Sequence, residues 1–136
     1  MQNVENEELG RGFFTGTSVV TQKGTFQVPE NYISKSRLVE GDELKVFIKE
    51  GRILFKQIRP VPRKAARGII LRKDNKCNVI VGDSQYKIIS ASARFFSLES
   101  GDEVMIQLPA EEKAEWAVVT YVIKRETEID REMDMN

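Results

Sequence analysis

Basic side chains crowd the middle of this chain, and they are the residues best suited to bind a ligand. Between Lys56 and Lys76 the sequence holds eight Lys and Arg residues but only one acidic residue, Asp74. Clustered cations attract polyanions, because each phosphate that they neutralise releases counterions. With first-half additions, the residues expected to contact nucleic acid are Lys23, Lys35, Arg37, Arg59, Arg63, Lys64, Arg67, Arg72 and Lys73. The alternative is that these side chains form a solvated linker and a lysine-rich strand edge that discourages aggregation.

Catalytic groups are scarce in the composition. The 136 residues include no histidine and a single cysteine, Cys77. This excludes His-based triads, His metal ligands and Cys-rich zinc sites, and no phosphate loop of the GxxxxGK[ST] or GxGxxG type occurs. Acid–base chemistry is left to carboxylates, lysines or tyrosines. We expect a non-enzymatic protein with no catalytic residue, no cofactor and no metal.

Three large aromatic residues of the second half are candidates for contact with a protein. Phe95 and Phe96 are adjacent in a short predicted helix, so both cannot face inward, and Trp116 follows in the next loop. Exposed aromatic side chains are typical anchors of protein interfaces. The alternative function is therefore an adaptor or structural subunit that forms a homo-oligomer or binds a protein partner. In the opposing interpretation, one phenylalanine packs inward and the other lies under a loop.

The charges are segregated along the chain although the net charge is zero. From Glu111 to Asn136, eight acidic residues face four basic ones. No stretch approaches the roughly 20 apolar residues that cross a bilayer, and the acidic start "MQNVENEELG" lacks the features of a signal sequence. A lone cysteine cannot form an internal disulfide. We expect a cytoplasmic protein that does not contact membranes.

The elements that must position these residues are repeated. "LVEGDELKVFI" at 38–48 returns as "LESGDEVMIQL" at 98–108, and residues 26–48 align with residues 86–108 with four identities in 23 positions and the same order of strand, short helix, Gly-Asp and strand. Glycine tolerates the positive φ needed where a chain reverses, and a short Asp side chain accepts bonds from nearby backbone N–H groups. These residues are expected to form structural turns, not a catalytic pair: Gly41, Asp42, Gly101 and Asp102.

The pattern resembles the GD box of the cradle-loop barrel superfamily. The closest local resemblance is to AbrB-like swapped-hairpin transcription regulators, carried by "VVTQKGTFQVPENYISKSRLVEGDELKVFIKEGRILFKQI" at 19–58. It implies a strand–strand–helix–strand unit that is used twice, with the two units interlocked about a pseudo-twofold axis. It also implies a DNA-binding regulator, so we expect DNA as the partner more than RNA.

The predicted fold is mainly β with two short helices, over 29–38 and 90–98. It is a pseudo-twofold β-barrel of the cradle-loop type, either AbrB-like or double-psi, and it closes within one chain or between chains. The expected organisation is a flexible N-terminal tail over 1–10, a first half-barrel over 11–59, a basic Pro-containing connector over 60–66, a second half-barrel over 67–123 and an acidic tail over 124–136.

Overall fold

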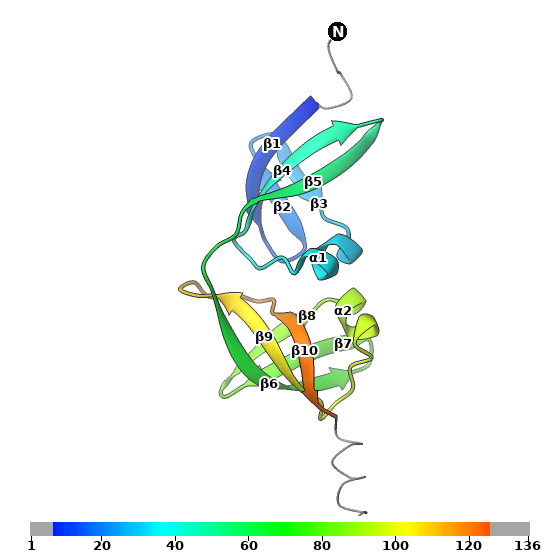
Figure 1. Ribbon diagram of the computed structural model, residues 1–136, viewed down its shortest axis with the longest axis vertical. Coiled ribbons are helices and arrows are strands. Elements are labelled where there is room, and N and C mark those ends of the chain that lie inside the picture. The colour runs from blue at the N-terminus through cyan, green and yellow to red at the C-terminus, as the bar shows by residue number, and fades with distance from the viewer. Residues whose placement is uncertain (1–6, 126–136) are drawn as a thin grey trace, which may run out of the picture.

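The computed structural model describes residues 7–125, which form two halves of the same construction stacked along the long axis of the molecule (Figure 1). The first half contains β1 (Glu7–Phe14), β2 (Ser18–Thr21), β3 (Gly24–Gln27), α1 (Glu30–Ser36), β4 (Glu43–Lys49) and β5 (Arg52–Arg59). The second half contains β6 (Arg63–Lys73), β7 (Lys76–Val81), β8 (Ser84–Ile88), α2 (Ser90–Phe95), β9 (Glu103–Pro109) and β10 (Val118–Lys124). The predicted class, mainly β with two short helices, is confirmed.

Each half builds one antiparallel five-stranded sheet with the same strand order. The orders are β3-β2-β1-β4-β5 and β10-β9-β6-β7-β8. Three strands joined by hairpins are followed by a helix, which carries the chain back so that the fourth strand lies beside the first. This is a Greek key, extended by a fifth strand.

The repeated Gly-Asp turns occupy equivalent places in the two sheets. Gly41 and Gly101 have φ angles of 97° and 96°. Their N–H groups donate to the carbonyls of Phe14 and Ile70, at 2.8 and 2.9 Å. The repeat in the sequence is therefore also a repeat of backbone geometry.

The described strands form two separate sheets, one in each half. Among the described strands, none pairs with a strand of the other half. The reason lies in the first strand of each half. β1 pairs with both β2 and β4, and β6 pairs with both β7 and β9, so each half completes its own sheet.

Two predicted boundaries also change. Residues 7–10, expected in the tail, belong to β1, because the backbone of Glu7 pairs with Ile48 although its side chain is polar. Only residues 60–62 separate β5 from β6, since pairing starts again directly after the second proline, at Arg63. Lys124 ends β10, and the rest of the predicted acidic tail from 126 onward lies outside the described residues.

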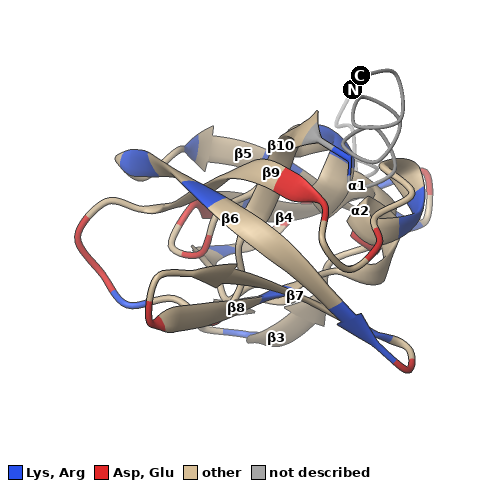
Figure 2. Ribbon diagram, turned by 90° about the horizontal axis from the view of Figure 1, so that it is seen from below, with Lys and Arg blue, Asp and Glu red and all other residues tan. Residues whose placement is uncertain are grey.

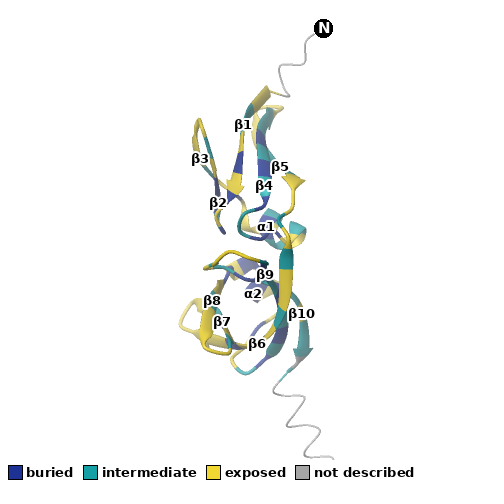
Figure 3. Ribbon diagram, turned by 90° about the vertical axis from the view of Figure 1, so that its left-hand side faces the viewer, coloured by how far each residue is buried: buried dark blue, intermediate teal, exposed yellow. Residues whose placement is uncertain are grey.

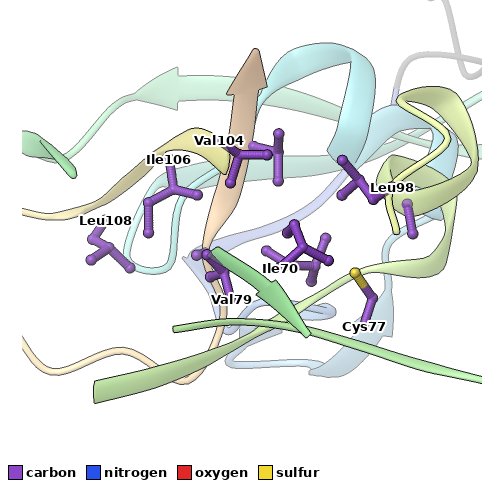
Figure 4. Close-up of a cluster of buried hydrophobic side chains, with 11 residues drawn as sticks. Ile70, Cys77, Val79, Leu98, Val104, Ile106 and Leu108 are labelled. Carbon is purple, nitrogen blue, oxygen red and sulfur yellow. The ribbon is translucent and has the colours of Figure 1, made fainter. Parts of the chain in front are cut away.

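Each sheet has a core of its own, produced by alternation along the strands. In β4, Leu44 and Val46 have no exposed surface, whereas Lys45 between them points to the opposite face. Figure 3 shows the same alternation of buried and exposed positions in both halves. Figure 4 shows the core of the second half, where side chains from β6, β7 and β9 meet Leu98 after α2.

The halves are joined along a seam between α1 and α2. Ile89 and Ala91 of the second half belong to the buried cluster of the first. The Glu40 carboxylate accepts the N–H groups of Glu115 and Trp116, at 2.8 and 2.6 Å. Apolar burial and hydrogen bonds therefore fix one half against the other. In the described part of the chain, no helix is long and apolar enough to cross a membrane.

Candidate nucleic-acid interface

The nine basic residues singled out in the sequence do not gather on one surface. Lys23 lies in the turn between β2 and β3, while Lys35 and Arg37 lie at the end of α1. Lys64 and Lys73 are near opposite ends of β6, an eleven-residue strand, which at ~3.3 Å per residue spans about 33 Å. Figure 2 shows basic segments at both ends of this strand.

Five of the nine residues have side-chain partners within the protein, and one of them, Arg37, makes only a 3.4 Å bond to the carbonyl of Thr120. The guanidinium group of Arg63 lies 2.6 Å from Asp42 and also donates to the carbonyl of Arg37. Arg72 donates to the carbonyl of Leu98 at 2.8 Å. These two side chains stabilise the chain near the Gly-Asp turns. The other two make surface ion pairs: Arg67–Glu103 at 3.4 Å and Arg59–Glu43 at 4.0 Å.

The Gly-Asp turns have partners that the sequence reasoning missed. Fully buried Asp42 accepts the N–H groups of Val39 and Val61, the amide of Gln57 and the guanidinium of Arg63. In the second half, Asp102 accepts the N–H of Glu99 and lies 3.3 Å from Arg125.

A signal for these partners was present in the sequence. Arg63 follows Asp42 by 21 residues, and Arg125 follows Asp102 by 23 residues, each just beyond the last strand of its half.

The strongest concentration of cations lies on the outer face of β1, β4 and β5. Lys45 stands directly opposite Arg11 on one side and Lys56 on the other, and Lys49 stands opposite Arg52. We call the whole set the cationic face: Arg11, Lys45, Lys49, Arg52, Lys56 and Arg59. Like charges directly opposite one another destabilise a sheet. The fold therefore holds these side chains together at a cost.

Acidic neighbours compensate little of this charge. Glu8 lies 3.3 Å from Arg11 and Glu43 lies 4.0 Å from Arg59, and both arginines are exposed, so these pairs contribute little. Within the described residues, no ion pair involves the four side chains of the two directly opposed pairs, Lys45–Lys56 and Lys49–Arg52. The repulsion between these opposed cations is therefore not offset by acidic partners within the hairpin.

Aromatic rings lie among these cations. The ammonium of Lys45 is 5.3 Å from the ring centroid of Phe47, a cation–π distance. Phe13 on β1 is 62% exposed on the same outer face. The face therefore offers both positive charge and flat apolar surface.

The equivalent face of the second half carries more apolar residues, together with the Arg67–Glu103 ion pair. Met105 replaces Lys45 and Pro109 replaces Lys49 when the repeats are superimposed in sequence. Ile69 and Ile80 stand opposite one another and are 44% and 37% exposed, and Tyr121 is 55% exposed. The cationic face is therefore a property of the first half's sequence, not a consequence of the fold.

The residues expected to contact nucleic acid include only Arg59 of the cationic face, so five members were missed: Arg11, Lys45, Lys49, Arg52 and Lys56. Counting charges along the chain hides them, because each lies apart from the next basic residue in the sequence. A usable signal was the alternation of apolar and charged residues on either side of "KEGR" at 49–52, since a hairpin turn there places alternate residues of both strands on one face.

The interface candidates separate into two places. Phe95 is 76% exposed, and its ring lies edge-on to Phe96, with centroids 4.9 Å apart. Trp116 instead packs against the first half's core, in the seam. In the part of the chain that the structure describes, no group of three or more His, Cys, Asp or Glu side chains could hold a metal ion.

Comparison with known proteins finds no matching family model and no matching curated protein. The function is therefore inferred from the arrangement of the residues alone.

Proposed function

We propose that this is a non-enzymatic protein that binds duplex DNA through the cationic face of the β4–β5 hairpin. One observation carries the proposal: two pairs of cations, Lys45–Lys56 and Lys49–Arg52, are directly opposed on an outer face. A structural role would favour opposite charges at these positions. A polyanion relieves the repulsion and releases counterions when it binds.

The shape of the hairpin supports DNA as the polyanion. β1 pairs along β4 as far as Ile48, so the edge strand β5 and the turn after β4 are the parts of the hairpin that could enter the major groove of B-DNA, where their cations would reach phosphates. β5 is an edge strand. In Figure 1 the tip of the hairpin points away from the second half, which leaves the ribbon accessible. Phosphate contacts would dominate this interface.

The superfamily and the regulatory role of the protein are part of the same proposal. The repeated Gly-Asp turn agrees with a place in the cradle-loop superfamily, and the AbrB-like resemblance implies transcription regulation in the cytoplasm. Single-stranded RNA is the competing ligand, because five-stranded Greek-key barrels such as OB-folds also bind oligonucleotides on a sheet face.

The test is a binding titration with a fluorescently labelled DNA duplex at several salt concentrations. Exchanging Lys49→Glu and Arg52→Glu together should weaken binding and reduce the slope of log affinity against log salt by about 2. The matched control is Lys73→Glu with Lys76→Glu, which makes the same charge change at an opposed pair of the second sheet. Equal losses in both variants, or stronger binding to single-stranded RNA than to the duplex, would contradict the proposal.

A second candidate function is a protein-interaction module, and the apolar outer face of the second half favours it. Exposed apolar residues from three strands occur there: Ile69, Leu71, Ile80 and Tyr121. Contiguous exposed apolar surface is typical of protein contacts. Mass measurement in solution tests it. An oligomer that dissociates on Ile69→Ser with Ile80→Ser would support this function, and a monomeric wild type without a copurifying partner would not.

A further inference from the structure

A groove of about 550 Å³ runs between the two helices on the surface of the seam. One wall comes from α1 and its end, with Lys35 and Arg37, and the other from α2, with Ala91, Phe95 and Phe96. The groove combines an exposed phenyl ring with two cations. We propose that residues 126–136 of the same chain occupy it.

The cations of the groove lack an acidic partner in residues 7–125. None of the ion pairs there involves Lys35, Arg37 or the neighbouring Arg94. Arg37 donates only a long bond, 3.4 Å, to the carbonyl of Thr120. A ligand for this groove should therefore be anionic.

The apolar part of the groove should bind an apolar side chain, in addition to the anionic group that its cations should bind. Phe95 is 76% exposed, although the neighbouring Phe96 is partly buried. Val119 of β10 and Ala91 continue the apolar lining. Burying this surface would contribute roughly 25 cal/mol per Å².

The segment that follows Arg125 has the matching chemistry. Residues 126–136 carry five Asp or Glu residues, one Arg and three apolar side chains, Ile129, Met133 and Met135. The chain in residues 7–125 has the opposite balance, with 20 Lys and Arg against 15 Asp and Glu. Residues 126–136 therefore combine acidic and apolar side chains, and they follow a stretch, residues 7–125, that has a net positive charge.

The segment also starts beside the groove. The guanidinium group of Arg125 donates to the carbonyl of Phe96 at 2.6 Å and to that of Ser97 at 3.1 Å. Phe96 itself lines the groove. Eleven residues can span about 36 Å when extended. Because the segment is tethered, its effective concentration is in the millimolar range, so a weak contact suffices.

The experiment uses the full chain with a nitroxide label at Asp134→Cys. Cys77 is 6% exposed and should stay unlabelled. In ¹H–¹⁵N spectra, the label should abolish the amide signals of Ser34, Lys35, Ala91 and Phe95, and it should spare Gly51 at the tip of the β4–β5 hairpin. Persistence of the four groove signals would overturn the proposal.

Two further arms make the result specific. Phe95→Ser, at an exposed position that should not affect folding, and Lys35→Glu with Arg37→Glu should each restore the groove signals. Lys73→Glu with Lys76→Glu should not. In a mixture of labelled ¹⁴N protein and unlabelled ¹⁵N protein the groove signals should persist, and their loss would assign the groove to a second copy and overturn occupancy by the same chain.

Discussion

Arg63 and Asp42 form an ion pair of 2.6 Å across the boundary between the two halves. The acid belongs to the Gly-Asp turn of the first half, and the arginine opens the first strand of the second. Arg125 and Asp102 form the corresponding pair at 3.3 Å. The repeated turn therefore serves as an anchor for the chain segment that leaves each half, in addition to reversing the chain.

Removing the first anchor should be the more damaging change. Asp42 has no exposed surface and accepts bonds from four groups. Asp42→Ala leaves the Arg63 charge and two N–H groups unpaired, so we expect a loss of about 3–5 kcal/mol in the free energy of unfolding. Asp102→Ala loses fewer bonds around a more exposed arginine, and should cost roughly 1.5–3 kcal/mol. Denaturant titrations measure both, with exposed Asp83→Ala as the control. Equal losses at the two turns would contradict this ranking.

The seam can be tested through Trp116, the single tryptophan of the chain. A Cβ atom at Gly16, where φ is +111°, would lie 2.2 Å from Cδ1 of Trp116. Gly16→Ala should therefore displace the indole, shift its fluorescence emission to longer wavelength and destabilise the protein by about 1–3 kcal/mol. Gly51→Ala is the matched control, since φ is also positive there but no atom lies near the new Cβ. A red shift in the control, or none in Gly16→Ala, would contradict the packing.

Cys77 should make stability sensitive to alkaline pH. Burial raises the pKa of its thiol, although the nearby Arg72 charge opposes this, because the buried thiolate is poorly solvated. The unfolded chain thus loses this proton at lower pH than the folded chain. The resulting stability is complete below the unfolded pKa and is lost as pH rises toward the folded one. Between pH 7 and 10, the free energy of unfolding should fall more for the wild type than for Cys77→Ala. Parallel pH profiles would refute this.

Local patterns predicted the elements well, whereas long-range pairing was beyond them. Turn residues indicated both short helices and the Gly-Asp turns that follow them, because these features depend on neighbours in sequence. The pairing of β1 depends on β4, thirty and more residues away in the chain, so local patterns did not reveal that each half forms a sheet of its own. The resemblance implied two interlocked units.

The candidate site illustrates the same limit. Arg63 was grouped with nucleic-acid contacts because charge was counted along the chain, yet its side chain faces a buried acid. Lys45 and Lys49 were passed over because neither lies in a run of basic residues, and only the strand register brings them opposite Lys56 and Arg52. Charge patterns in a β protein are therefore better predicted by strand face than by sequence position.

The opposed cations of the cationic face should lower the stability of the protein and raise its affinity for DNA. Lys56→Glu places a carboxylate opposite Lys45 and converts a repulsive cross-strand pair into an attractive one. The free energy of unfolding should rise by roughly 0.2–1 kcal/mol, while affinity for a DNA duplex falls because a phosphate contact becomes repulsive. Lys56→Gln removes the repulsion without adding attraction, so it should lie between the two in both measurements. If Lys56→Glu lowers stability, or leaves DNA binding unchanged, the opposed lysines have a structural role and the proposed contact surface is wrong.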